Sequence, residues 1–528
     1  LIPRFRRIFL GDKEFNKKRY AKHLKNVVEN KICPTCNGQR LNSKILSCKI
    51  IGKNISDFTQ MTVKENLVFL NKLNNSTAQF IIEPLRKQLE ALDYIGLSYL
   101  TLNRVTTSLS GGEAQRLKLI RHLNSSLSDL VYIIDEPSVG LHPEDIAKIN
   151  EILKSLKHKG NTVLIVEHDP DVIKEADYII DMGPSSGAQG GEITFKGTYK
   201  ELLSSDTSTG EALRIKHHLK NEIREAKSFY HLGPVTQNNL NNVTVDIPKH
   251  VLTILTGVAG SGKSSLVKAG FAKNDNAVFM DQKAIQGSDR SNLLTYLGVF
   301  DRVRNFFSKE TGLNKSMFSY NSKGACPNCG GKGYIETELA FMGEFSQTCE
   351  VCHGKRYKPE VLNATIDGYS IADFLELTVD EGIKFFDKEN EIQSKLQAIS
   401  KTGLNYVTLG QPLSTLSGGE IQRVKLGQYL NDDVTDSIFI FDEPTTGLHE
   451  ADIPILINCF NDLIEQNNTV ILIEHNLSIM CDADWIIDVG PGPGLDGGKV
   501  QFSGYPINFV KENKTLTSKH LKLYIAND

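Results

Sequence analysis

The sequence predicts an α/β protein built from two similar halves in tandem, because several motifs recur at one fixed offset. The segment Leu109–Arg116 (LSGGEAQR) recurs as Leu416–Arg423 (LSGGEIQR). The tripeptide Asp-Glu-Pro at position 135 recurs at 442, and the dipeptide Glu-His at 167 recurs at 474. The tetrapeptide Asp-x-Gly-Pro at 181 recurs at 488. An offset kept over spans this long indicates a duplicated domain.

Length and composition indicate a globular protein with more than one core. The chain has 528 residues, of which 40% are hydrophobic and 23% charged. It contains neither an apolar run of 18 residues nor a signal-peptide pattern, so we expect a cytoplasmic protein without a membrane span. It begins at Leu1 rather than Met, which suggests a fragment. The net charge of −3 means that any nucleic-acid contact must come from local patches.

Short apolar runs that end in charged residues predict buried parallel strands with functional side chains at their carboxyl ends. These runs cover residues 129–135, 161–166, 250–256, 437–442 and 468–473. The segment Pro143–Lys157 reads as a helix, which completes a β-α-β unit in the first half. Residues 203–226 are polar with an amphipathic helical pattern and are expected to link the halves. The basic segment 1–31 favours either a solvated helix or a phosphate-contacting arm.

The segment Gly257–Ser264 matches the phosphate-binding loop pattern GxxxxGK[ST]. It follows a predicted strand and precedes a predicted helix at Ser265–Ala269, as the motif requires. Backbone N–H groups at the glycines would surround the phosphates of ATP, and the Lys263 ammonium would add a positive charge. The Ser264 hydroxyl would bind Mg²⁺. The predicted nucleotide-binding residues of this loop are Gly257, Gly260, Ser261, Gly262, Lys263 and Ser264.

Residues that follow the predicted strands supply candidate catalytic groups. Asp442 would lie near the metal, and Glu443 would orient or deprotonate the attacking water. Gln282 could reach the metal or the water, and His475 could donate a hydrogen bond to the γ-phosphate. The first half repeats three of these residues: Asp135, Glu136 and His168. The matching phosphate loop would fall before residue 1.

The repeated LSGGE segment is typical of a helix start, in which serine caps the helix and two glycines allow phosphate to approach the backbone. We expect Ser110, Gly111 and Gly112 of the first half to close over nucleotide held by Gly257–Ser264 of the second half. The equivalent residues of the second copy are Ser417, Gly418 and Gly419. A triphosphate would then be sandwiched between the two halves.

Six of the nine cysteines form Cys-x-x-Cys pairs, which favours metal binding over disulfides. Cys326 and Cys329 are separated by 19 residues from Cys349 and Cys352, a spacing typical of a tetrahedral Zn²⁺ site. Cys33 and Cys36 have no partner pair upstream in this chain. The remaining cysteines are expected in the core: Cys48, Cys459 and Cys481.

These motifs together resemble the UvrA family of ATP-binding cassette proteins, which act in bacterial nucleotide excision repair. The variants LSGGEAQR, DEPSVGLHP, DEPTTGLH and IEHN carry the resemblance, which covers nearly the whole chain. It implies two P-loop ATPase domains of this type in tandem, with inserted helical signature regions and zinc modules. Implied partners are damaged double-stranded DNA, UvrB and a second copy of the chain, and the zinc module would lie beside the DNA. The resemblance also implies that Cys33 and Cys36 form half of a second zinc site.

The resemblance suggests a division of the chain into seven segments. They are the end of an insertion domain (1–32), signature region I with half a zinc site (33–108), ATPase domain I (109–215), a linker (216–234), the P-loop part of ATPase domain II (235–310), zinc and signature region II (311–415), and the rest of ATPase domain II (416–528).

Basic and aromatic residues around the second cysteine module are candidate DNA contacts. The alternative is a solvated face with a few core aromatics. The candidates are Arg302, Arg304, Lys309, Lys315, Lys323, Lys332 and Lys355, with Phe306, Phe307, Phe318 and Tyr320 between them.

The segment 283–292 departs from the UvrA pattern and keeps only Arg290-Ser291-Asn292 of it, and the stretch 264–282 is short. Two alternatives to the repair subunit stay open, of which these departures favour the first, while the cysteine module and the fused halves argue against the second. One is a UvrA-like paralogue in tolerance to DNA-binding drugs. The other is the ATPase subunit of a small-molecule exporter.

Overall fold

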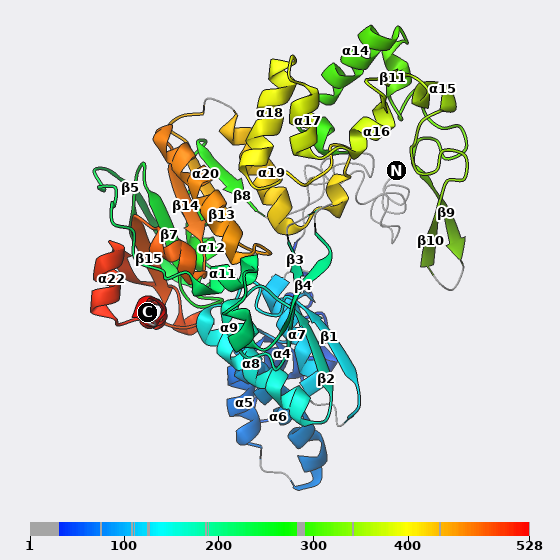
Figure 1. Ribbon diagram of the computed structural model, residues 1–528. Coiled ribbons are helices and arrows are strands. Elements are labelled where there is room, and N and C mark those ends of the chain that lie inside the picture. Colours follow the sequence, from blue (N-terminus) through cyan, green and yellow to red (C-terminus); the bar gives the residue numbers. More distant parts are fainter. Residues whose placement is uncertain are drawn as a thin grey trace.

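The computed structural model describes residues 31–73, 76–106, 109, 111–123, 127–184, 187, 190–281, 291–339, 343–431 and 434–526. The basic segment 1–30, Ser110 and Gln282 lie outside these residues. Figure 1 shows an α/β body of the second half, a body of the first half below it, and a helical region that extends toward a projecting hairpin. Below, half I denotes residues 31–215 and half II residues 235–526.

A six-stranded sheet forms the centre of half II, in the order β16-β15-β7-β14-β13-β8. All neighbours are parallel except β15 and β16. The strands are β7 (Leu252–Thr256), β8 (Ala277–Met280), β13 (Ile438–Asp442), β14 (Thr469–Ile473), β15 (Trp485–Gly490) and β16 (Lys499–Gly504). The predicted strands of this half and the α/β class are confirmed.

Both faces of this sheet are covered, which explains why its strands are continuously apolar. On one face Phe439 and Phe441 pack with α20 (Ile453–Glu465), α22 (Pro506–Glu512) and α23 (Leu516–Ala526). On the other face Ile438 and Ile440 pack with α12 (Lys263–Gly270) and with the antiparallel pair β5 (Phe229–Gln237) and β6 (Leu240–Pro248). The sheet therefore holds the phosphate loop rigidly at its carboxyl edge. Two short helices complete this body: η7 (Glu450–Asp452) and α21 (Leu477–Cys481). A third, η8 (Gly494–Asp496), lies between β15 and β16.

Half I repeats part of this architecture. The predicted β-α-β unit is present as β1 (Val131–Asp135), α8 (Pro143–His158) and β2 (Thr162–Val166), with β1 and β2 parallel. A separate antiparallel pair is formed by β3 (Ile179–Gly183) and β4 (Glu192–Gly197). No described strand joins β2 to β3, whereas β7 lies between β14 and β15 in half II. Short helices complete it: α9 (Pro170–Ile173), α10 (Tyr199–Leu202) and α11 (Ser208–Arg214).

The prediction that β1 and β2 are buried is wrong for one face. Val131 and Ile133 are 66% and 72% exposed, whereas their equivalents Ile438 and Ile440 are 0% and 2% exposed. The opposite face packs on α8 as predicted. The difference arises because, among the described residues, half I has no counterpart of α12 and the β5–β6 pair over this face.

Helical signature regions extend from both halves. In half I they are α3 (Ser43–Leu46), α4 (Ile55–Gln60), α5 (Val63–Asn71), η2 (Ser76–Ala78), α6 (Gln79–Tyr94) and α7 (Gly111–Leu123). In half II they are α13 (Leu293–Tyr296), α14 (Phe300–Thr311), η5 (Lys315–Phe318), α15 (Pro359–Leu362), α16 (Ile371–Glu376), α17 (Val379–Phe385), α18 (Asn390–Lys401), η6 (Leu413–Thr415) and α19 (Gly418–Leu430).

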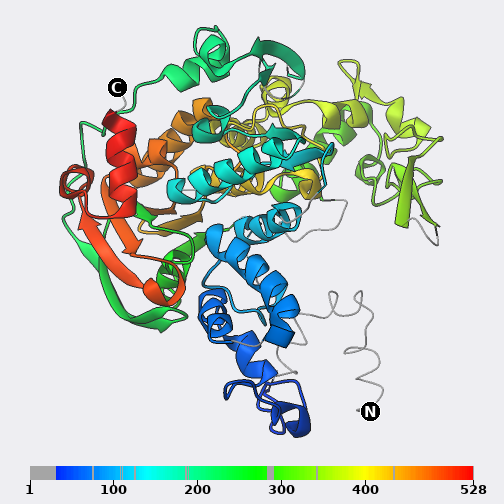
Figure 2. The same ribbon diagram turned by 90° about the horizontal axis from the view of Figure 1, so that it is seen from below.

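Two hairpins belong to the part of half II that contains the second and third Cys-x-x-Cys pairs. β9 (Tyr334–Leu339) pairs with β10 (Gly343–Thr348), and β11 (Thr365–Ile366) pairs with β12 (Tyr369–Ser370). In both views the β9–β10 hairpin projects away from the six-stranded sheet (Figures 1 and 2).

The linker between the halves is mostly extended rather than helical. Its predicted helix is limited to α11, and the chain after it lies against half II. The Lys220 ammonium lies 2.8 Å and the Arg224 guanidinium 3.1 Å from the carboxylate of Asp484, which is 1% exposed. A buried carboxylate paired with two cations fixes the linker to the sheet. In the described part of the chain no helix has both the length and the apolar character needed to cross a bilayer.

Candidate nucleotide and zinc sites

The phosphate loop connects β7 to α12, as predicted. Gly257, Gly260 and Gly262 have φ angles of 128°, 76° and 107°. These left-handed conformations strain any residue with a Cβ atom, which explains the three glycines. Gly262 directly precedes α12, so backbone N–H groups at the helix start point into the loop. Ser261 is fully buried, and its hydroxyl has no hydrogen-bond partner among the described residues. These features fit a bound phosphate chain.

Lys263 is 7% exposed, and its ammonium donates to the carbonyl oxygens of Gly257 (2.7 Å) and Val258 (3.0 Å). Burial lowers the pKa of Lys263 to about 8, although the Glu443 carboxylate nearby favours the charged form. The ammonium is thus held at the centre of the loop, where a triphosphate would offer stronger acceptors than carbonyl groups.

Asp442 lies at the end of β13 beside the loop. The Ser264 hydroxyl donates to one Asp442 carboxylate oxygen at 3.2 Å, and the Lys268 ammonium lies 3.0 Å from the other. A hydroxyl and a carboxylate this close fit the ligand pair that holds Mg²⁺ in P-loop enzymes. Ser264 and Asp442 would supply these ligands, and a bound magnesium ion would neutralise charge on the phosphates.

Glu443 follows β13 with a φ of 52°, and its backbone N–H donates to the Ile473 carbonyl at 2.9 Å. Burial and, to a smaller extent, the neighbouring Glu474 carboxylate raise the pKa of Glu443 to about 7. A carboxylate with this pKa could accept a proton from water at neutral pH.

His475 is 5% exposed, and its Nδ1 atom has no hydrogen-bond partner among the described residues. Burial lowers the pKa of His475 well below its usual value, so the ring is neutral. The preceding Glu474 carboxylate accepts hydrogen bonds from the backbone N–H groups of Thr445 (3.0 Å) and His475 (2.6 Å). Glu474 thereby fixes the loop after β13 and the loop after β14 beside the site. The sequence analysis did not predict this role, although the recurrence of Glu474 as Glu167 was a signal for it.

Half I contributes side chains to this site in half II. A Cβ atom on Gly260 would lie 2.8 Å from the Tyr99 ring, so this ring lies directly against the phosphate loop. The Tyr99 hydroxyl donates to the carboxylate of Glu113 at 2.6 Å, and Glu113 lies in the first turn of α7. The signature helix of half I is therefore connected to the phosphate loop of half II through Tyr99. The repeat pairs Tyr99 with Tyr406, a signal that the sequence analysis missed.

The loops after β1 and β13 face each other across the boundary between the halves, which we call the seam. A Cβ atom on Gly140 would lie 2.6 Å from the Glu443 carboxylate, and one on Gly447 would lie 3.6 Å from that of Glu136. A cavity of about 140 Å³ at the seam is lined by residues of both halves, including Gly140 and His475. The two halves therefore meet beside the phosphate loop of half II, and the nucleotide sandwich stays a prediction.

The predicted residues of half I form a similar arrangement. Glu136 has a φ of 43°, and His168 Nε2 lies 3.6 Å from its carboxylate. The Glu136 carboxylate beside the ring raises the pKa of His168. Asp135 ends β1 as Asp442 ends β13. The described residues contain no phosphate loop facing these groups.

The signature motifs begin helices, as predicted. Gly111 and Gly112 start α7, while Ser417 caps α19 by accepting from the Glu420 N–H at 3.3 Å. Gly418 and Gly419 form the first turn of α19, and a Cβ atom on Gly419 would lie 2.4 Å from the Thr446 carbonyl oxygen. The second glycine is therefore required by close packing, independently of any nucleotide.

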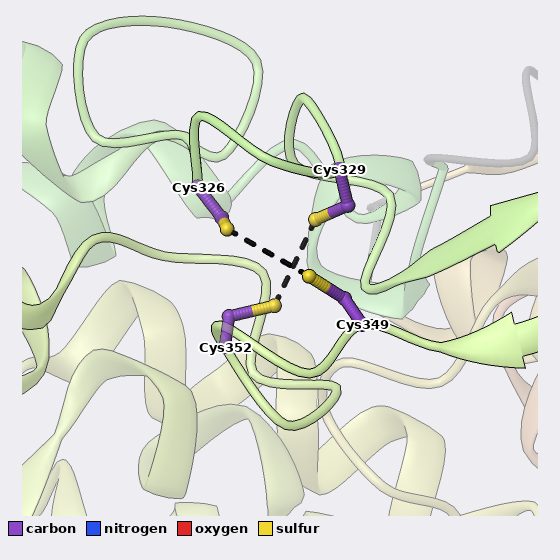
Figure 3. A group of neighbouring side chains, drawn as sticks. All are labelled: Cys326, Cys329, Cys349 and Cys352. Carbon is purple, nitrogen blue, oxygen red and sulfur yellow. Dashed lines mark hydrogen bonds between the residues drawn. The ribbon is translucent and has the colours of Figure 1, made fainter.

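The four cysteines Cys326, Cys329, Cys349 and Cys352 converge at one point between two knuckle loops (Figure 3). All four are buried, and their sulfur atoms lie within 4.8 Å of one another. The Cys326–Cys349 and Cys329–Cys352 sulfur separations are 4.0 and 3.7 Å. Tetrahedral zinc with bonds of about 2.3 Å requires sulfur separations of about 3.8 Å, so the cluster fits Zn²⁺.

Backbone and amide donors surround these thiols. The Gly333 N–H donates to the Cys329 sulfur at 3.2 Å, and the Asn328 amide donates to the Cys349 sulfur at 3.3 Å. Hydrogen bonds, the largest from the Cys352 backbone N–H, lower the pKa of Cys349 to about 6. Such donors stabilise thiolates, which are the form that binds zinc.

The other cysteines follow the predictions only in part. Cys459 and Cys481 are buried, as expected, but Cys48 is exposed. Residues 40–53 around Cys48 are exposed apart from the partly exposed Leu46, so no core forms there among the described residues. Cys33 is exposed and Cys36 is partly exposed. No further group of metal-binding side chains is found near them in the described part of the chain, so their role in a half site stays a prediction.

The predicted stacking of aromatic residues on DNA is wrong for three of the four candidates. Phe307, Phe318 and Tyr320 are at most 1% exposed and form the core that packs against α16. Several of the basic candidates are paired with carboxylates, as Arg302 is with Glu391. The other such pairs are Arg304 and Lys315 with Asp301, and Lys355 with Asp373. The core alternative is the correct one for these aromatics.

Comparison with known proteins agrees with this geometry. A family model described as "ABC transporter" matches residues 240–446. The chain is 39% identical over 570 residues to UvrABC system protein A of Aquifex aeolicus, with 100% of the chain and 61% of the relative covered. It is 40% identical over 545 residues to the protein of that name from Bacillus subtilis, covering 96% of the chain and 57% of the relative. The chain thus spans about three fifths of these curated relatives.

Among solved structures, UvrA2 from Deinococcus radiodurans aligns with a TM-score of 0.90 and 36% identity. The alignment covers 98% of this chain and 68% of that structure. Since identity and fold agree over nearly the full length, the chain contains an ATPase domain of the ATP-binding cassette type and belongs to the UvrA family.

Proposed function

We propose that this chain binds and hydrolyses ATP at the seam between its halves and uses the nucleotide state to control binding of damaged duplex DNA. Residues Gly257–Ser264 would hold the phosphates, Ser264 and Asp442 the magnesium ion, and Glu443 the attacking water. His475 would contact the γ-phosphate. The observation that carries the proposal is the contact of half I with this site, through Tyr99 at Gly260 and Gly140 at Glu443.

The role of half I in turnover follows from this geometry. Gly111 and Gly112 begin the helix that Tyr99 connects to the phosphate loop, so we propose that they and Ser110, which precedes them in the sequence, complete the site in the closed state. Asp135, Glu136, His168, Ser417, Gly418 and Gly419 would form the equivalent second site with a further phosphate loop.

The biological role that we propose is nucleotide excision repair in the cytoplasm, with loading of UvrB and action as a homodimer. The zinc module, held by Cys326, Cys329, Cys349 and Cys352, would lie beside the DNA. Cys33 and Cys36 would belong to a second zinc site. The similarity to a UvrA2 structure also favours a second candidate, a paralogue in tolerance to DNA-binding drugs. Family membership sets the exporter alternative aside.

A fluorescence anisotropy titration with labelled duplexes tests the DNA-binding proposal. We expect tighter binding to a duplex with one bulky adduct than to the undamaged duplex, with a preference that changes between ATP and ADP. Affinity should fall steeply between 50 and 200 mM salt, because phosphate contacts release counterions. Equal affinity for both duplexes in every nucleotide state would contradict the proposal.

A second measurement separates the two candidate roles. Purified UvrB is added to the complex with damaged DNA, and its transfer to the DNA is followed by mobility shift. The repair subunit should load UvrB in an ATP-dependent way. Damage-selective binding without loading would favour the paralogue.

A further inference from the structure

The repeated Asp-x-Gly-Pro motif has no role in the site described above. Its second copy places Asp488 in β15, directly beside Thr256 at the end of β7. A Cβ atom on Gly257 would lie 3.0 Å from the Asp488 carboxylate and 2.0 Å from the Val489 carbonyl oxygen. Asp488 is 3% exposed. The motif therefore forms the floor on which the phosphate loop begins.

A side chain of half I reaches Asp488 through one intermediate residue. The Thr517 hydroxyl in α23 lies 3.4 Å from the Asp488 carboxylate and 3.0 Å from the His142 Nε2 atom. His142 belongs to half I, immediately before α8, and is fully buried. We call the three residues His142, Thr517 and Asp488 the inter-half relay.

The hydrogen atoms of the relay have one consistent arrangement. His142 caps α8, and its Nδ1 atom accepts from the Glu144 backbone N–H at 3.2 Å. Burial lowers the pKa of His142 to about 3, so the ring is neutral and carries its proton on Nε2. Nε2–H then donates to Thr517, whose hydroxyl donates to the Asp488 carboxylate. Each donor in the relay has an acceptor, which makes it a directional link across the seam.

The same arrangement occurs a second time with the halves exchanged. His449 of half II accepts from the Ala451 N–H on Nδ1 at 3.2 Å, and its Nε2 lies 3.1 Å from the Thr209 hydroxyl. Thr209 donates to Asp181 of half I at 2.8 Å. An accidental polar contact would not be expected to recur in this order on both sides of the seam.

The histidine of each relay also lies beside a histidine of a proposed nucleotide site. The ring centroids of His142 and His475 are 5.9 Å apart, and those of His449 and His168 are 6.3 Å apart. His142 therefore contacts the ring proposed to sense the γ-phosphate, and it is connected through Thr517 to the floor of the phosphate loop.

We propose that His142 and Thr517 are positioning residues that transmit closure of the seam to the phosphate loop of half II. This inference rests on the proposed ATPase function and deepens it, since it assigns a role to the histidine of the DEPSVGLHP motif and to the aspartate of the Asp-x-Gly-Pro motif. The loop carrying His142 moves with half I, so the relay forms fully only when the halves are in contact. Asp488 then holds Gly257 and the loop in the geometry for turnover.

Replacing Thr517 with valine removes the hydroxyl and keeps the shape of the side chain. Loss of one buried hydrogen bond should lower kcat for ATP about fivefold, with little change in KM, because the link acts on the closed state. Thr517→Ser should restore wild-type kcat. His142→Asn keeps a good helix cap but is too short to reach Thr517, so it should cause the same loss. The double variant should be no slower than either single variant.

Amide hydrogen exchange without nucleotide gives a readout that does not require hydrolysis. Thr517→Val should speed exchange about fivefold in peptide 252–270 and in peptide 136–146, and Thr517→Ser should not. Unchanged exchange in both peptides, a serine variant as impaired as the valine variant, or losses that multiply in the double variant would overturn the relay. A wild-type protein that does not hydrolyse ATP would instead refute the proposed function, and the exchange experiment would still decide on the relay.

Discussion

Replacing Lys263 with alanine should reduce ATP turnover at least about 100-fold, the range found when one charged or hydrogen-bonding group is removed from a preorganised site. The ammonium lies buried at the centre of the phosphate loop, where it contacts two loop carbonyls. No other cation of the described loop residues 257–264 could replace it. Steady-state phosphate release measures turnover, and a fluorescent ATP analogue measures nucleotide binding. Both activities should be lost in this variant.

Two further variants make this result specific. Glu443→Gln removes the proposed base but not the phosphate contacts, so turnover should be lost while ATP binding is kept. Lys273→Ala changes an exposed lysine just beyond α12 and should behave as wild type. A Lys263→Ala protein with turnover within twofold of wild type would show that the phosphates are held elsewhere.

Loss of the zinc site should have the second-largest effect, and it should be confined to the zinc-bearing region. Zinc binding stabilises small zinc modules by about 10–16 kcal/mol, which is as large as the whole free energy of unfolding of a typical domain. Cys349→Ser removes one of four buried ligands and should lower the zinc content by about one ion per chain. Residues 319–359 should then become sensitive to protease while the six-stranded sheet stays folded.

The matched control is Cys48→Ser, which changes an exposed cysteine outside the cluster. It should leave both the zinc content and the protease pattern unchanged. Metal analysis and limited proteolysis provide the measurements. An unchanged zinc content in Cys349→Ser would mean that the four thiols do not form the metal site.

Local motifs were predicted well because the interactions that fix them are local. The phosphate loop, β13, β14 and the cap at Ser417 follow from glycine conformation, strand periodicity and helix capping, all within a few residues. The cluster of four cysteines was also predictable, since two short loops bring the four sulfur atoms together. For these elements the pattern contains most of the structural information.

Contacts between distant residues were not predictable in the same way. The contacts of Tyr99 with Gly260 and of His142 with Thr517 depend on how the two halves pack. Tyr99 recurs as Tyr406 and His142 lies in the motif DEPSVGLHP, but neither signal identifies the residue of the other half that is contacted. The aromatic residues near the cysteine module illustrate a different error, in which a contact was predicted that the structure does not support. Their spacing fits DNA stacking and a helical core equally well, and the packing of Phe307 against Phe318 decides for the core.

The exposed face of β1 shows a further limit. Its apolar pattern matches that of β13, so the sequence predicts equal burial for the two strands. The burial of a strand depends on the layer that packs over it. The apolar pattern of the strand itself does not reveal whether such a layer covers each face.

The central claim is that half I completes the ATP site of half II, and turnover by Ser110→Arg tests it most directly. This serine belongs to the signature of half I and is distant in sequence from the Lys263 loop. Turnover should fall at least about tenfold while ATP binding at Lys263 is kept, because a phosphate-facing helix start would be blocked. The same change at Ser417 should cost less. Turnover in Ser110→Arg equal to that of wild type would contradict a site shared between the two halves.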